Sequence, residues 1–170
     1  MKVRRAIWQW LLRPLYTLLP GRGNRVRIWV LRMMGADIAR HCFIGRNVDV
    51  LMPWNLVMGE RSSIGHDCEI VNFARVSIGP MSVVSQHTSL CTGSHDHTHP
   101  HFPLTFDPIV IGSECWVAAW VFVGPGVTIG DGAVIGVRSV ALKDMPEWQV
   151  CGGHPCRPIK PREIKRIESA

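Results

Sequence analysis

Residues 111–140 read IGSECW VAAWVF VGPGVT IGDGAV IGVRSV, which are consecutive units of six residues. The first position of each unit is Ile or Val, the second is often Gly, and the fifth is a small or aliphatic residue. A period of six fits neither an amphipathic helix nor a two-sided strand. It does fit a solenoid in which three short strands make one triangular coil of about eighteen residues.

The same phase extends over an earlier part of the chain. Aliphatic first positions recur there at Ile64, Ile70, Ile78, Val84 and Leu90. These residues are expected to fill the interior of the prism, and Gly at the second position is expected to take a positive φ at the bend. We therefore predict a mainly β fold, a left-handed parallel β-helix over residues 41–151. A helical cap over 1–40 and a tail with a short helix over 152–170 complete the domain organisation.

One long interruption breaks the phase. The distance from Leu90 to Ile111 is three residues more than a whole coil, so the chain must leave the prism there. The segment 93–108 reads GSHDHTHPHFPLTFDP and is too rich in His and Pro for a solenoid face. Loops that leave a rigid scaffold often carry function, so this excursion is the first place to look for chemistry.

Composition bounds the class of protein. A chain of 170 residues is expected to form one domain with one core. The six cysteines have no CxxC spacing, and Cys68 and Cys115 fall at fifth positions of hexads. They are interpreted as reduced core residues of an intracellular protein, so a thiol metal site is not expected.

The net charge of +6 originates at the N-terminus, because residues 1–36 contain eight Lys or Arg and no acidic residue. This segment predicts one helix that ends at Pro14 and a second from Arg25 to Met34.

The apolar runs of this N-terminal segment are too short to span a bilayer. Two interpretations remain open: the apolar face covers the first coil, or Trp and Arg side chains dock on anionic lipid. A nucleic-acid partner is not expected, since no recognition motif surrounds the basic residues.

Four histidines alternate in the excursion, at positions 95, 97, 99 and 101. A zinc pair from His95 and His99 is one interpretation, but a loop with prolines and no thiol is a poor preorganised site. His95 follows the last regular hexad directly, so the scaffold should fix its position best. A neutral imidazole suits removal of a proton from an alcohol during acyl transfer. His95 is therefore the candidate general base.

Several stretches of the chain resemble the hexapeptide-repeat O-acetyltransferases that use acetyl-CoA, and most closely the colanic-acid-type exopolysaccharide acetyltransferases. The stretches are PWNLVMGERSSIG (53–65), VSQHTSLCTGSHD (84–96), the run from Pro108 to Asp144, GGHPCRPIK (152–160) and NRVRIWVLRMMGADI (24–38). The TGSHD run is the most specific of them. Asp96 after His95, in place of Pro, favours a polysaccharide-precursor acceptor over a free sugar.

The resemblance implies roles for individual residues. His95 would be the base in direct transfer to a sugar hydroxyl, without an acyl-enzyme. Substrate contacts would come from Asn72, Asp96 and Trp116, although Asn72 could instead be a turn residue of an overlong coil and Trp116 a surface aromatic. Donor contacts would come from Ala118, Ala119, Gly136, Val137, Lys143, Arg157 and Lys160.

The resemblance also implies a homotrimer with acetyl-CoA as acyl donor, a sugar or lipid-linked glycan as acceptor, and no metal. We expect a cytoplasmic protein, with possible peripheral contact at the inner face of the membrane through the N-terminal helix. Two alternatives remain. One is a non-catalytic β-helix scaffold. The other is a zinc-dependent enzyme of the carbonic-anhydrase type, for which His66 and His87 are the candidate ligands from other coils.

Overall fold

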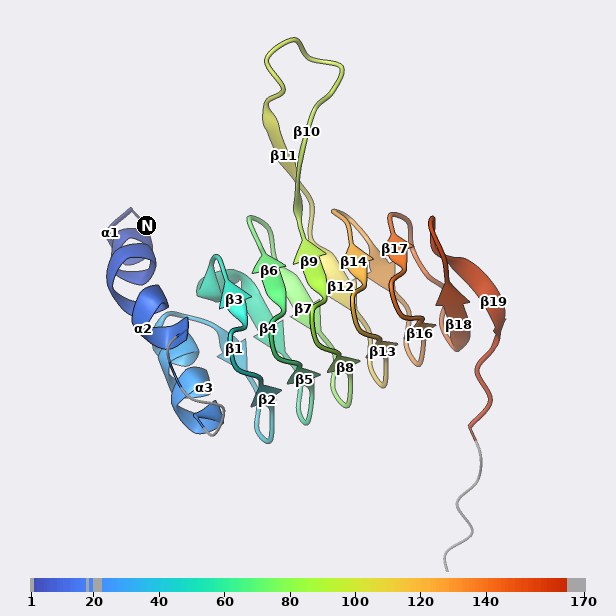
Figure 1. Cartoon of the computed structure of the whole chain (residues 1–170), viewed down its shortest axis with the longest axis horizontal. Helices are drawn as coiled ribbons and strands as arrows, with labels where there is room; N and C mark the ends of the chain where they lie inside the picture. The colour runs from blue at the N-terminus through green and yellow to red at the C-terminus, as the bar shows by residue number, and fades with distance from the viewer. Residues whose placement is uncertain (1, 18, 20–22, 165–170) are drawn as a thin grey trace, which may run out of the picture.

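The computed structural model describes residues 2–17, 19 and 23–164. Three sheets form the faces of an elongated prism, with helices at its N-terminal end and a hairpin that projects from its side (Figure 1). All strand pairs of the prism are parallel except the last pair, β18 and β19. The parallel β-helix predicted from the hexads is confirmed.

Successive strands visit the three sheets in turn. Sheet A contains β1 (Asp37–Ile38), β4 (Leu56–Met58), β7 (Val76–Ile78), β12 (Ile109–Ile111) and β15 (Thr128–Ile129). Sheet B contains β2 (Phe43–Ile44), β5 (Ser63–Ile64), β8 (Val83–Val84), β13 (Trp116–Val117), β16 (Val134–Ile135), β18 (Gln149–Gly152) and β19 (Arg157–Pro161). Sheet C contains β3 (Asp49–Val50), β6 (Glu69–Val71), β9 (Ser89–Cys91), β14 (Phe122–Val123) and β17 (Val140–Ala141).

The core is a set of aliphatic columns inside the prism. On sheet B the strand register stacks Ile44, Ile64, Val84, Val117 and Ile135 above one another. All five side chains are 0 % exposed. Every coil therefore buries its first-position residue against the coils before and after it, which is how a solenoid accumulates stability.

The turns between sheets are named here the A–B, B–C and C–A corners. At the B–C corner each coil has one residue with a left-handed φ of 53° to 62°, and this residue stands at the fourth position of its hexad. These residues are Asn47, Asp67, His87, Trp120 and Arg138. The predicted positive φ of the second-position glycines is therefore wrong.

The second-position glycines are required for a different reason. A Cβ atom at Gly45 would lie 2.4 Å from the backbone nitrogen of His66, and one at Gly65 would lie 2.5 Å from that of Gln86. Both separations are too short for any side chain, because the backbone of the next coil lies directly against these glycines. Close backbone packing, and not bend conformation, explains the glycine pattern.

The N-terminal cap contains α1 (Lys2–Ala6), the π-helical turn η1 (Ile7–Leu12), α2 (Arg13–Thr17) and α3 (Asn24–Met33). The predicted helix end at Pro14 is wrong, because the helix continues to Thr17. The wider π-helical turn before Pro14 accommodates the proline ring, which would collide with a carbonyl in an α-helix. The second helix agrees with its prediction to within one residue at each end.

The cap packs against the first coil through two buried side chains. Trp8 is 0 % exposed and its Nε1 donates a hydrogen bond of 2.9 Å to the carbonyl of Val50. Arg27 is 1 % exposed and its Nε donates to the carbonyl of Ile44 at 3.0 Å. In this geometry the segment covers the first coil, and docking of its other side chains on lipid stays a prediction.

The C-terminal part differs from its prediction. Residues 153–156 form a turn and Arg157–Pro161 forms β19, which pairs antiparallel with β18. The described residues of the tail therefore form a strand where a short helix was expected, because pairing with β18 covers the exposed edge of sheet B. Residues 165–170 of the predicted tail lie outside the described part of the chain.

Candidate functional site

The excursion is a two-stranded hairpin, here called the arm, which projects from the C–A corner after β9 (Figure 1). Its strands β10 (Gly93–His95) and β11 (Leu104–Phe106) are antiparallel, with His95 opposite Leu104. At its base a Cβ atom on Gly93 would lie 2.8 Å from Cδ2 of the Phe73 ring. The close contact of Gly93 with Phe73 fixes where the arm begins.

His95 is exposed at the end of β10, and one of its ring nitrogens has a defined partner. Its Nδ1 lies 2.6 Å from the carbonyl oxygen of Phe102 on the returning limb of the arm. A carbonyl oxygen can only accept a hydrogen bond, so Nδ1 carries the proton and Nε2 of the neutral ring carries the lone pair. Sequence reasoning missed this orienting group, because a backbone carbonyl seven residues away leaves no signature in side-chain identity.

Asp96, predicted to contact substrate, folds back on the arm. Its Oδ1 accepts hydrogen bonds from the backbone nitrogen of Thr98 at 2.9 Å and from the Thr98 hydroxyl at 2.6 Å. These bonds from Thr98 lower the pKa of the Asp96 carboxyl. The carboxylate therefore stabilises the turn that follows His95, and a substrate contact by Asp96 stays a prediction.

Asn72 lies at the C–A corner one coil before the arm, and its side chain is 0 % exposed. Its Oδ1 accepts from the backbone nitrogen of Met52 at 2.8 Å, and its Nδ2 donates to the Met52 carbonyl at 2.7 Å. The amide thus closes the corner of the preceding coil. This placement favours the turn interpretation of Asn72 over the predicted acceptor contact.

The predicted pantetheine contacts lie at another corner. Ala118 and Ala119 occupy the B–C corner between β13 and β14, and Gly136 and Val137 occupy the same corner one coil later. Val137 is 63 % exposed. Trp116 on sheet B is 50 % exposed and turns toward this corner, because its Nε1 donates to the hydroxyl of Ser85 at 3.0 Å.

Sheet C separates the two groups of residues. Within one chain His95 follows the end of β9 at the C–A corner, whereas Ala118, Ala119, Gly136 and Val137 precede strands of sheet C at the B–C corner. The structure therefore brings the donor residues together along one edge and leaves His95 on the opposite edge.

The predicted phosphate contacts lie toward the C-terminal end of the prism. Lys143 follows β17 at the C–A corner, and Arg157 and Lys160 lie on β19, opposite Gly152 and Val150 of β18. All three basic side chains are exposed. Arg157 is the one beside the B–C corner, since β18 ends there at Gly152 and the carbonyl of Cys151 accepts from the backbone nitrogen of Gly136 at 2.8 Å.

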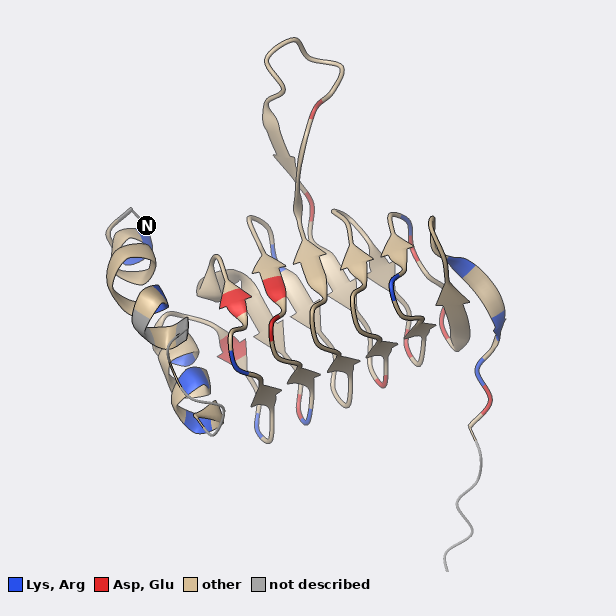
Figure 2. Cartoon of the chain, viewed as in Figure 1, with Lys and Arg blue, Asp and Glu red and all other residues tan. Residues whose placement is uncertain are grey.

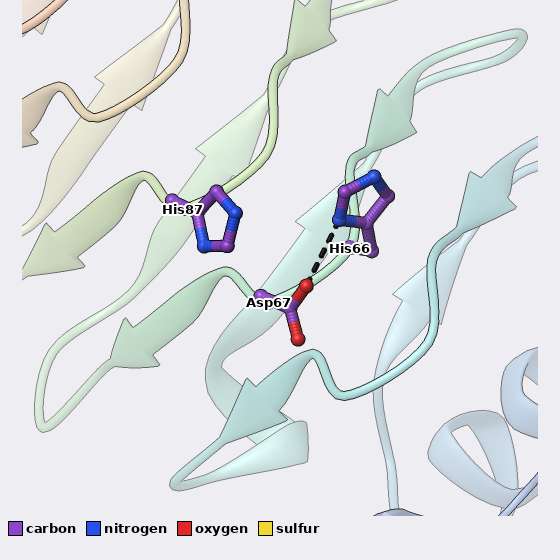
Figure 3. A group of neighbouring side chains, drawn as sticks. All are labelled: His66, Asp67 and His87. Carbon is purple, nitrogen blue, oxygen red and sulfur yellow. Dashed lines mark hydrogen bonds and ion pairs between the residues drawn. The ribbon is translucent and has the colours of Figure 1, made fainter.

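One cluster outside the arm could hold a metal ion. In the described part of the chain, one group of three potential metal ligands comes together. It consists of His66, Asp67 and His87, and one ligand atom from each residue lies within 4.8 Å of the others (Figure 3). It lies at the B–C corner. The alternative of a zinc pair from His95 and His99 in the arm gains no third ligand among the described residues. The neighbouring rings in the arm are those of His99 and His101, with centroids 5.7 Å apart.

Comparison with known proteins places these observations in a family. A profile of the bacterial transferase hexapeptide repeat (six repeats) matches residues 108–140. The Escherichia coli K12 protein WcaF, named as a colanic acid biosynthesis acetyltransferase, is 42 % identical over 160 residues, which is 94 % of this chain and 84 % of WcaF. The chain belongs to the hexapeptide-repeat acetyltransferases.

Solved structures agree with this assignment. A maltose O-acetyltransferase from Clostridium difficile 630 superposes with a TM-score of 0.85 at 26 % identity, over 95 % of this chain and 88 % of that one. A galactoside acetyltransferase in complex with coenzyme A gives a TM-score of 0.87 at 25 % identity, over 95 % and 82 %. The resemblance inferred from the hexads and the TGSHD run is confirmed, and the chain is an acetyltransferase of this family.

Proposed function

We propose that the protein transfers an acetyl group from acetyl-CoA to a sugar hydroxyl of an exopolysaccharide repeat unit or its lipid-linked precursor, with His95 as general base. The observation that carries the proposal is the bond between His95 Nδ1 and the Phe102 carbonyl. It leaves Nε2 as the basic atom of an exposed imidazole. The relationship to WcaF supports the class of acceptor.

The chemistry proceeds by direct transfer. Nε2 of His95 takes the proton of the hydroxyl as its oxygen attacks the thioester carbonyl. The tetrahedral adduct collapses, the carbon–sulfur bond breaks, and CoA leaves as a thiolate that receives the proton from the imidazolium. The Phe102 carbonyl stabilises the imidazolium at Nδ1–H during this step, since the hydrogen bond strengthens when the ring becomes charged. No side chain of the protein is acylated during the transfer.

A complete site requires more than one copy of the chain. His95 and the donor edge lie on opposite sides of sheet C, so one protomer would supply the arm and its neighbour the B–C corner. Such a head-to-tail contact closes into a ring when the rotation is a fraction of a full turn, and a homotrimer satisfies this condition. The projecting arm gives His95 the reach to cross to a neighbouring prism (Figure 1).

The donor would lie along the B–C corner with its phosphates toward the end of the prism. The small residues Ala118, Ala119 and Gly136 leave the backbone accessible to the pantetheine arm. Beyond them, the guanidinium of Arg157 offers a charged fork for a phosphate, and Lys160 on the same strand adds positive charge. Lys143 lies across sheet C at the C–A corner, so it would reach this donor only from a neighbouring protomer. This direction would bring the thioester toward the middle coils, at the level of the neighbour's arm.

The N-terminal cap would bring the enzyme to a membrane surface, where a lipid-linked acceptor resides. No helix in the part of the chain that the structure describes is both long and apolar enough to cross a bilayer. Trp10 is nevertheless 81 % exposed and Trp29 is 60 % exposed, among arginines with no acidic neighbour in the helices (Figure 2). A hollow beside α3 is lined by Arg25, Arg32 and Arg40. Exposed indoles and arginines together suit peripheral binding to anionic lipid.

A thiol-release assay tests the proposed activity. Purified full-length protein is incubated with acetyl-CoA and a panel of free sugars, oligosaccharides and undecaprenyl-linked glycans, and free CoA is measured. The proposal predicts acceptor-dependent release of CoA, fastest with a lipid-linked or oligomeric glycan. A chain that releases no CoA with any acceptor and any short acyl-CoA would be a scaffold, and the proposal would be wrong.

A further inference from the structure

Three polar side chains that acyl transfer does not use gather at the B–C corner, in the two coils that precede Ala118 and Ala119. His66 and Asp67 follow β5, and His87 follows β8. The carboxylate of Asp67 points toward the His66 ring, and the His87 ring approaches from the next coil (Figure 3). The ring centroids of His66 and His87 are 5.8 Å apart.

The backbone holds two of these residues in equivalent positions of successive coils. Asp67 and His87 both have a left-handed φ, of 57° and 59°. The backbone nitrogen of His87 donates to the carbonyl of His66 at 3.1 Å, and that of Asp67 donates to the carbonyl of Arg46 at 3.0 Å. Their Cα atoms are therefore fixed by the coil spacing, and only the side-chain torsions remain free.

Neighbouring coils restrain the side chains as well. Asn47, in the coil before, donates from Nδ2 to Oδ1 of Asp67 at 2.9 Å, which leaves Oδ2 directed at His66. Trp120, in the coil after, stacks on the His87 ring with centroids 4.2 Å apart and an interplanar angle of 15°. Asp67 and His87 thus each have a supporting group in a neighbouring coil, as ligands in built metal sites do. His66 is held by its hydrogen bond to Asp67.

The donor set matches borderline divalent metals. Two imidazoles and one carboxylate, with positions left open to water, are a common ligand set for zinc and other first-row transition ions. Ligand atoms around a zinc ion at 2.0–2.1 Å lie about 3.3 Å from one another. The ligand atoms of the three residues lie within 4.8 Å of one another. Rotation of the His66 side chain, which is half exposed, would shorten these distances to the spacing around zinc. Binding of a metal at His66 Nδ1 would replace the hydrogen bond between this nitrogen and Asp67 Oδ2, and the neutral ring would then carry its proton on Nε2.

We propose that His66, Asp67 and His87 form a binding site for a divalent first-row transition metal, with Zn²⁺ as the expected ion. Within one chain the site lies at the B–C corner, across sheet C from the arm. Its ligands come from two successive coils, and it lies beside Trp120, which directly follows the predicted donor contacts Ala118 and Ala119. It therefore adds a metal-dependent support to the donor edge without a part in proton transfer.

Cobalt titration of the full-length protein tests the proposal. Protein without a histidine tag is treated with chelator, dialysed, and titrated with Co²⁺ while the visible absorption is recorded, and Zn²⁺ is then added to displace the cobalt. The expected result is one Co²⁺ per chain, a d–d spectrum without thiolate charge-transfer bands, and displacement by one equivalent of Zn²⁺. His87→Ala and Asp67→Asn should each weaken Co²⁺ binding at least tenfold, and Asn47→Ala about tenfold through loss of its support.

The arm provides the matched control. The double variant His99→Ala/His101→Ala removes the other pair of neighbouring histidines and should leave both stoichiometry and affinity unchanged. Wild-type protein that fails to bind Co²⁺, binding that disappears in the arm variant, or binding that survives His87→Ala would each overturn the proposal. Thermal unfolding of the metal-free variants separates loss of a ligand from loss of the fold.

Discussion

The Nδ1 atom of His95 lies 2.6 Å from the carbonyl oxygen of Phe102, so the two limbs of the arm are joined by the ring that we propose as the base. Phe102 has a φ of 45°, which few residues with a side chain adopt, and its nitrogen donates to the carbonyl of His99 at 3.0 Å. The tautomer of His95 therefore depends on backbone conformation at one position of the returning limb.

Two substitutions at Phe102 distinguish the role of its backbone carbonyl from that of its side chain. Phe102→Gly keeps the carbonyl and favours the positive φ, so kcat should remain within about threefold of wild type. Phe102→Pro fixes φ near −65° and removes the nitrogen donor, which displaces the carbonyl. We expect kcat to fall at least tenfold with little change in KM for acetyl-CoA. Steady-state kinetics measure both, and equal activity of the two variants would contradict the orienting role of the carbonyl.

Substitution of two tryptophans in the cap is predicted to affect two different properties, stability for Trp8 and membrane binding for Trp10. Trp8 is 0 % exposed, so Trp8→Ala should lower the free energy of unfolding by about 3–5 kcal/mol. Trp10 is 81 % exposed, so Trp10→Ala should leave that free energy within about 0.5 kcal/mol of wild type. It should instead weaken binding to vesicles with anionic lipid several-fold. Denaturant unfolding and vesicle sedimentation measure the two effects, and vesicle binding that is unaffected by Trp10→Ala would argue against membrane docking.

Arg157 is predicted to act on the donor alone. Arg157→Ala removes one charged contact to a phosphate at an exposed position, where about 1 kcal/mol is typical. KM for acetyl-CoA should rise about fivefold and kcat should change little. Arg61→Ala, which replaces an exposed arginine at the A–B corner, provides the control with the same change in charge. If both variants alter KM for acetyl-CoA equally, general electrostatics and not a specific contact is responsible.

The cysteines are predicted to be unreactive in the folded protein. Five of the six are buried and Cys91 is half-buried. Burial raises the pKa of Cys68 to about 11, so its thiolate is scarce at neutral pH. Alkylation at pH 7.5 should therefore modify at most Cys91 until denaturant is added. Because the unfolded thiol ionises near its ordinary value of 9.0 and the folded one near 11, stability should decrease as the pH rises through that window. Rapid native modification of several thiols would contradict the core placement.

Much of the fold follows from local sequence, and the differences have physical causes. The hexads predict the prism because each aliphatic first position, such as Ile64 or Val117, fills the same column. The reason for the glycines does not follow from the period, since contact between coils at Gly45 depends on a neighbour that the period alone does not reveal. The helix through Pro14 and the strand Arg157–Pro161 depend on tertiary packing that the sequence pattern does not encode.

The candidate site was predictable in part. Its base stands out because His95 directly ends a regular hexad, and the donor residues fall in register at one corner. The partners of these residues were not predictable, because the Phe102 carbonyl and the burial of Asn72 arise from how the arm and the corner fold. The sequence offers His66 and His87 as candidate zinc ligands but does not predict that Asp67 lies with them, since residues about twenty positions apart meet only when the coils stack.

The rate of CoA release by His95→Ala, measured beside wild type with acetyl-CoA and the best glycan acceptor, bears most directly on the proposed chemistry. The variant should keep its circular dichroism spectrum and oligomeric state, because the His95 ring lies exposed on the arm and outside the core. Its rate should fall at least ~10²-fold. Turnover at the wild-type rate would show that another group accepts the proton and that the imidazole on the arm is not the base.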